Sequence, residues 1–102
     1  IPTSANQEDH VSMATYAAYR LLQMNKNLAC VVAIEYLCAA QGIEFHEPLR
    51  TSANLVSTIK KIRKISGSFE YDRSLASDIK LLSQMIINGK FSDPKHEIFS
   101  QK

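Results

Sequence analysis

The feature that most constrains the fold is a long segment, residues 7–41, that is rich in Ala, Leu and Met, which all favour helix. Positions spaced alternately by four and three residues form one nearly all-apolar face: Ala17, Leu21, Met24, Leu28, Val31, Glu35 and Cys38. Over residues 28–40 the other faces are apolar too, which is typical of a helix covered on all sides. Such a helix would be about 50 Å long, more than a 102-residue domain can cover. We therefore expect it to belong in a larger bundle or a subunit interface.

Two shorter amphipathic helices are predicted after it, over residues 52–65 and 77–88, and no segment shows strand alternation. Ser77 and Asp78 suit the N-cap of the last helix. Gly42 stands where a helix C′ residue would follow the long helix, and Gly67 and Gly89 close the other two segments. The predicted fold is all-α: a long buried helix, then two shorter amphipathic helices, within one domain that is part of a larger helical bundle.

Composition excludes several classes of function. The net charge of +2 gives no electrostatic case for binding nucleic acid or an anionic membrane. The sequence KKIRK at 60–64 is therefore interpreted as a solvated helix face. The apolar run at 28–40 is interrupted by Glu35 and is too short to span a bilayer, which needs about 20 residues.

Cysteine and histidine spacing argues for packing rather than chemistry. Cys30 and Cys38 would lie about 12 Å apart on one helix, too far for a disulfide. We expect them to be buried free thiols in a reducing cytosol. His10, His46 and His96 have no partners at metal-ligand spacing, so no metal site is expected.

The first thirteen residues, IPTSANQEDHVSM, place strongly polar side chains at the start of the 7–41 segment, before its apolar residues begin to repeat. One interpretation is structural. Ser4 and Gln7 form a Ser-x-x-Gln capping box, and Glu8 and Asp9 would lie in the first helical turn, where negative charge is favoured. The other interpretation is that these side chains line a site, and the two are compatible.

Several segments resemble the aromatic amino acid ammonia-lyase family, and within it the branch that acts on histidine. The most specific is IPTSANQEDHVSMA, followed in order by NLACVVAIEYLCAAQGIEF, LRTSANL and DRSLASDI. The resemblance covers residues 1–90, which correspond to the C-terminal helical portion of such an enzyme. Residues 91–102 form a tail that is not diagnostic.

The resemblance implies a cytoplasmic homotetramer that converts L-histidine to trans-urocanate and ammonia without an external cofactor or a metal. The electrophile of this family is a methylidene-imidazolone (MIO) made from an Ala-Ser-Gly tripeptide. No Ala-Ser-Gly occurs in this chain, and the nearest sequence is Ile65-Ser66-Gly67. The family's catalytic tyrosine and substrate-carboxylate arginine also have no counterpart here. We therefore expect the chain by itself to be inactive.

One functional position carries over from the family pattern, the acidic residue of the NQED run, which is Glu8 here. Glu8 is predicted to be catalytic and to bind substrate, and the neighbouring Gln7 is predicted to bind substrate. A carboxylate can accept the imidazole N–H in a charge-assisted hydrogen bond, whereas a phenyl ring would leave it unpaired. Whether Glu8 orients the ring or helps to move the β-proton stays open, and Asp9, His10 and Ser12 are interpreted as structural.

Two alternatives remain at this point. The chain could be a non-catalytic helical module whose role is oligomerisation. It could also come from a related lyase or aminomutase that acts on tyrosine or phenylalanine, although Glu8 argues against this.

Overall fold

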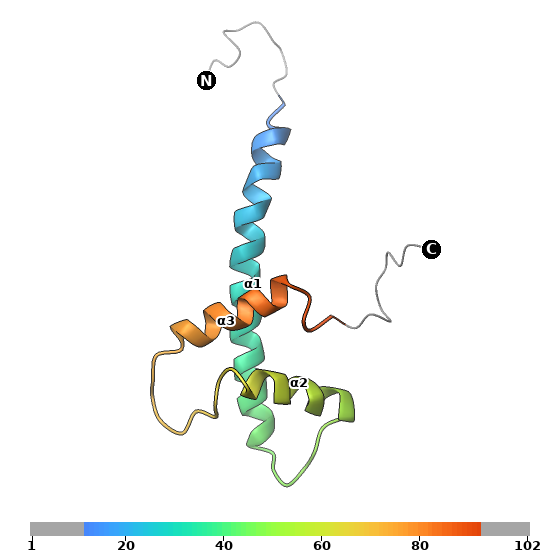
Figure 1. The fold of residues 1–102 in the computed structure, drawn as a ribbon, viewed down its shortest axis with the longest axis vertical. Helices are drawn as coiled ribbons and strands as arrows, with labels where there is room; N and C mark the ends of the chain where they lie inside the picture. Colours follow the sequence, from blue (N-terminus) through green and yellow to red (C-terminus); the bar gives the residue numbers. More distant parts are fainter. Residues whose placement is uncertain (1–11, 93–102) are drawn as a thin grey trace, which may run out of the picture.

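The computed structural model describes residues 12–92, which form three helices and no strand. They are α1 (Ala14–Glu44), α2 (Ala53–Arg63) and α3 (Ala76–Ile87). Helix α1 is a long rod, and α2 and α3 both lie across its C-terminal half (Figure 1). The predicted all-α architecture, one long helix followed by two shorter ones, is confirmed for the described residues.

The ends of α1 differ from the predicted ends. Ser12 and Met13 are not helical, and α1 begins at Ala14, whose N–H donates to Ser12 Oγ at 3.4 Å. The predicted start at residue 7 is therefore wrong. The predicted capping residues, Ser4, Gln7, Glu8 and Asp9, lie outside the described residues.

At its other end α1 continues through Gly42 to Glu44, so the prediction that Gly42 is the C′ residue is wrong. The helix ends in a turn over residues 45–48, in which the Phe45 N–H donates to the Gln41 carbonyl at 3.3 Å. A glycine within a helix lowers its stability by only about 1 kcal/mol relative to alanine. Packing and polar contacts made by the last turn of α1 outweigh that cost.

The core lies between the C-terminal half of α1 and the two short helices. Its buried members are Ala33, Leu37 and Ala40 from α1, Ile62 from α2 and Leu82 from α3. The alanines keep this face of α1 narrow, which lets the crossing helices approach closely. After α3 the chain turns back, and Phe91 packs edge-on against Tyr36 with ring centroids 5.1 Å apart.

The covered face of α1 is not the predicted stripe. Ala29, Ala33 and Leu37 are buried, whereas the stripe through Leu21 and Leu28 is 53% and 60% exposed. At 100° per residue the two sets lie on roughly opposite sides of the helix. Within this chain, therefore, α1 is covered on one side of its C-terminal half and not on all sides.

The two cysteines of α1 are also less buried than predicted. Cys38 is exposed and Cys30 is only partly buried, so the prediction that both are buried is wrong for this chain. Neither forms a disulfide, in agreement with their spacing along α1.

The two short helices use different end signals. Ser52 caps α2 by accepting the Leu55 N–H at 3.4 Å. Helix α3 starts at Ala76 after Leu75, so Ser77 is not its N-cap, and the Ser77 hydroxyl instead donates to Asp78 at 3.2 Å. The predicted N-cap role of Ser77 is therefore wrong.

Gly89 ends α3 as predicted. Its φ of 70° places it in the left-handed region that favours glycine. The Gly89 N–H donates to the Ile86 carbonyl and the Lys90 N–H to the Met85 carbonyl, both at 3.0 Å. This pair of bonds is the Schellman motif, which satisfies carbonyl groups of the last turn.

Candidate functional site

The two predicted site residues, Glu8 and Gln7, lie outside the described residues. The structure does describe the start of the helix that follows them. There, Ala14, Ala17, Ala18, Arg20, Leu21 and Met24 line an open depression of about 620 Å³. All six of these residues are exposed. The N-terminal part of α1, which follows the predicted site, is therefore not covered by any other described element of this chain.

The densest polar site among residues 12–92 is centred on Arg63, at the end of α2. Arg63 Nε donates to Glu44 Oε1 at 2.6 Å, and Nη2 donates to Gln41 Oε1 at 3.3 Å. Glu44 Oε2 accepts the Ser68 hydroxyl at 2.8 Å, and Gln41 Oε1 accepts the Phe69 N–H at 2.8 Å. We call these five residues the Arg63 cluster. It joins the last turns of α1 and α2 to the connection that leads to α3.

A second group adjoins it. Arg73 Nη1 donates to Asp78 Oδ2 at 2.8 Å, and Nη2 donates to the Ser66 hydroxyl at 2.9 Å. The Phe69 ring contacts both guanidinium groups, with its centroid 5.8 Å from Arg63 Cζ and 5.4 Å from Arg73 Cζ. Both distances are within the range of cation–π contacts.

Both carboxylates in these groups are held in the charged form. The hydrogen bond from Arg63, aided by Ser68, lowers the pKa of Glu44 against the opposing effect of burial. The Ser66 hydroxyl and then Arg73 lower the pKa of Asp78, again against burial. A carboxylate with a lowered pKa and occupied oxygens is a poor proton acceptor near neutral pH. These groups are therefore suited to holding structure rather than to acid–base catalysis.

The prediction that the KKIRK segment is a solvated face is correct for Lys60 and Lys64, which are exposed. It is wrong for Arg63, which is the centre of the polar cluster. Lys61 also has a specific contact, because its Nζ donates to the Lys90 carbonyl at 3.2 Å. No short-range pattern marks Arg63, since its partner Glu44 lies nineteen residues earlier.

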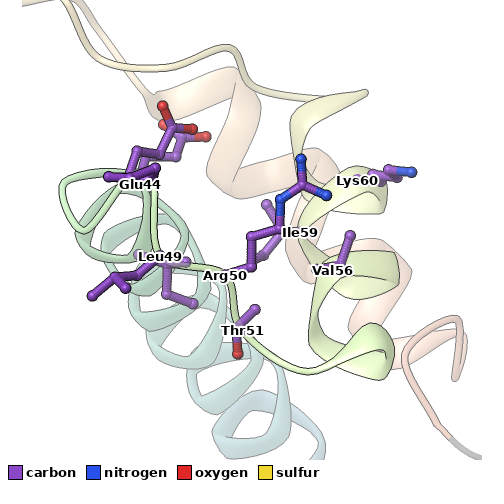
Figure 2. Close-up of a pocket in the computed structure, with 10 residues that line it drawn as sticks. Glu44, Leu49, Arg50, Thr51, Val56, Ile59 and Lys60 are labelled. Atoms are coloured by element: carbon purple, nitrogen blue, oxygen red, sulfur yellow. The ribbon is translucent and has the colours of Figure 1, made fainter.

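An open groove of about 810 Å³ lies beside the Arg63 cluster, between the end of α1, the following turn and α2 (Figure 2). Its lining combines apolar and charged side chains: Ile43, Glu44, Glu47, Pro48, Leu49, Arg50, Thr51, Val56, Ile59 and Lys60. Arg50 rises from the turn into the space between α1 and α2 (Figure 2). Glu44 belongs both to this groove and to the Arg63 cluster.

The only Ser-Gly dipeptide in the chain does not fit the electrophile of the resembled family. It is preceded by Ile65 rather than Ala, and the Ser66 hydroxyl accepts a hydrogen bond from Arg73. The Gly67 carbonyl accepts one from Arg63 at 3.2 Å. Ser66 and Gly67 are thus engaged in the polar contacts of Arg73 and Arg63, and the Ile-Ser-Gly sequence does not fit an MIO group.

Among residues 12–92, no three His, Cys, Asp or Glu side chains lie close enough together to hold a metal ion. None of the helices in this part of the chain is both long enough and apolar enough to cross a membrane.

Comparison with known proteins gives a consistent result. A model of the aromatic amino acid lyase family matches residues 1–64. Histidine ammonia-lyase of Legionella pneumophila (strain Corby) is 48% identical over 92 residues, 90% of this chain and 18% of the relative. That of Bartonella quintana is 49% identical over 98 residues, 96% of this chain and 19% of the relative.

A third relative, the histidine ammonia-lyase of Rhodospirillum rubrum, is 50% identical over 91 residues, 89% of this chain and 18% of its own length. The chain thus spans about a fifth of the length of these relatives. The family model covers more than half of the chain, and the chain therefore belongs to the aromatic amino acid lyase family.

Proposed function

We propose that this chain is the C-terminal part of a histidine ammonia-lyase, with residues 1–90 as its helical portion and residues 91–102 as its tail. The observation that carries the proposal is 48–50% identity to histidine ammonia-lyases over about nine-tenths of the chain. The whole enzyme would eliminate ammonia from L-histidine to give trans-urocanate. Its MIO electrophile would come from an Ala-Ser-Gly tripeptide in a part of the protein upstream of this chain.

In this proposal Glu8 faces the substrate, with Gln7 beside it. The Glu8 carboxylate accepts the imidazole N–H of histidine, a bond that a phenylalanine or tyrosine ring cannot supply in the same place. Glu8 therefore supports histidine over the other aromatic amino acids. The chain contributes one wall of the active site, and the reacting electrophile lies elsewhere in the protein.

The exposed surface of α1 supports an assembled enzyme, which we propose to be a cytoplasmic homotetramer. Large apolar side chains on the outer stripe are more than half exposed, including Leu21, Met24, Leu28 and Val31. A contiguous apolar surface of this kind marks a contact with other protein. Helix α1 would then be covered by the rest of the polypeptide and by other subunits.

The test is a pair of substitutions in the full-length enzyme. Glu8→Gln keeps the size of the side chain and removes its charge, so it should lower the turnover of histidine by about 100-fold or more. Asp9→Asn makes the same chemical change at a position interpreted as structural, and should retain most of the activity. Urocanate formation is followed by its ultraviolet absorbance.

A near-wild-type rate for Glu8→Gln would remove Glu8 from any role toward the substrate. Absence of urocanate formation by the wild-type full-length protein would contradict the proposed activity itself. The isolated 102-residue chain is expected to form no urocanate, and detectable product from it would overturn that expectation.

The exposed apolar surface of α1 also favours a second candidate function, a non-catalytic module that mediates oligomerisation. Urocanate formation by the full-length protein would exclude it. A third candidate is a lyase or aminomutase specific for tyrosine or phenylalanine. Comparing histidine, tyrosine and phenylalanine as substrates of the full-length protein separates this candidate from the first.

A further inference from the structure

We propose that Arg63 is a latch that holds the connection between α2 and α3, residues 64–75, closed against the last turn of α1. We further propose that the latch opens when the Glu44 carboxylate is protonated. The inference is independent of the proposed enzymatic function, because it rests only on contacts within residues 41–78.

The first support is the set of atoms that Arg63 joins. Its Nη1 donates to the carbonyls of Ser66 at 3.3 Å and Gly67 at 3.2 Å, both in the connection. Its other nitrogens donate to Glu44 and Gln41 on α1. One guanidinium therefore ties two helix ends and a loop, which uses the planar, five-donor geometry that arginine has and lysine lacks.

The second support concerns the hydrogen bonds between the connection and α1, which act beside the apolar contacts that Ile65 and Phe69 make with the core. Gly67, Ser68 and Glu70 are exposed, and Phe69 is only half-buried. The bonds from the connection to side chains of α1 are those of Ser68 to Glu44 and of the Phe69 N–H to Gln41. Both acceptors are partners of Arg63, so loss of the guanidinium would disturb both contacts.

The charge environment explains why acid would open the latch. Glu44 faces Arg63 from α2 and Ser68 from the connection. Lys60 of α2, together with Glu47 and Arg50 from the segment between α1 and α2, lines the adjoining groove. Protonation would remove the negative partner of Arg63, whose side chain is 16% exposed, and leave its positive charge uncompensated.

A second carboxylate, Asp78, faces Arg73 and Ser66 at the α3 end of the connection. It would respond to acid in the same direction. The pKa of Glu44 is lowered by Arg63, so the closed state is fully favoured above the ordinary carboxyl range. It is lost as the pH falls through the lowered value.

The test is hydrogen exchange of the Phe69 amide, measured by NMR on the 102-residue chain. Arg63→Met removes the guanidinium and keeps an unbranched apolar stem. It should speed exchange of this amide by about 10- to 100-fold, the effect of losing a charged hydrogen bond. Lys64→Met is the matched control, because the adjacent Lys64 side chain is exposed, and it should leave the exchange rate unchanged.

A pH titration of the unsubstituted chain gives a second readout that does not depend on the variant folding. Protection of the Phe69 amide, corrected for intrinsic exchange, should fall in step with protonation of Glu44. In Arg63→Met the midpoint of Glu44 should move upward. Unchanged Phe69 exchange in a folded Arg63→Met chain would overturn the latch, as would protection that stays constant while Glu44 titrates.

Discussion

The two halves of α1 have similar helix-forming sequences and opposite surroundings. In the C-terminal half, residues 29–44, the small side chains of Ala29, Ala33 and Ala40 are buried, and Ala33 and Ala40 belong to the core formed with α2 and α3. In the N-terminal half, residues 14–28, every side chain is exposed, including Tyr19 at 75%. Helical periodicity predicts both halves equally well. Burial depends on whether another element of the chain returns to cover them.

This difference separates two sources of stability. Burying a large aliphatic side chain contributes roughly 1.5–3 kcal/mol, and in this chain only the C-terminal half of α1 gains that contribution. The N-terminal half has helix propensity and local hydrogen bonds alone, which are marginal for a short isolated helix. We infer that the C-terminal half, with α2 and α3, is the more stable part of the chain.

The largest expected effect compares two leucines on the two sides of this boundary. Leu82 on α3 is fully buried against the C-terminal half of α1, whereas Leu21 is 53% exposed. Leu82→Ala should lower the free energy of unfolding by about 3 kcal/mol, through lost burial and a residual cavity. Leu21→Ala should change it by less than about 0.5 kcal/mol. Urea unfolding of the 102-residue chain measures both, and equal losses would break the comparison.

A smaller effect is expected at two glycines. Gly89 has a φ of 70°, so Gly89→Ala should cost about 1–2 kcal/mol of unfolding free energy. Gly42 is inside α1, and a Cβ added there meets no atom within 4 Å. Gly42→Ala should therefore raise the unfolding free energy by about 0.5–1 kcal/mol. Thermal unfolding followed by circular dichroism shows whether each substitution raises or lowers the stability. A destabilised Gly42→Ala variant would contradict a helix that continues through residue 42.

The smallest effect is expected at the cap of α2. Ser52→Ala removes the acceptor of the Leu55 N–H, a long bond of 3.4 Å, and should cost about 0.5–1 kcal/mol. Ser57→Ala is the matched control, because Ser57 is an exposed position within α2 where alanine is the better helix former. If Ser57→Ala proved as destabilising as Ser52→Ala, the cap would contribute nothing specific.

Much of the fold could be predicted from the sequence because its signals are local. The number and order of the helices follow from apolar periodicity, and the end of α3 follows from Gly89. The start of α1 and the N-cap of α3 were predicted wrongly. Serine and acidic residues near a helix start are compatible with several starting positions.

The face of α1 that is covered and the role of Arg63 could not be predicted, for a different reason. Arg63 pairs with Glu44, nineteen residues earlier, and Leu82 shares a buried core cluster with Leu37, forty-five residues earlier. No spacing within a single helix reports such partners. The predicted site residues, Glu8 and Gln7, lie outside the described residues and stay predictions.

The sequence by itself determined that this chain is helical, that it carries more apolar surface than it can bury, and which family it resembles. Those properties depend on residue type and on neighbours within one or two turns. The tertiary structure decided that the small-residue face of α1 is covered while the large-residue stripe is exposed. It also decided that a lysine- and arginine-rich segment supplies the residue tying α1, α2 and the connection together. Both outcomes depend on where the chain returns in space, which local periodicity does not encode.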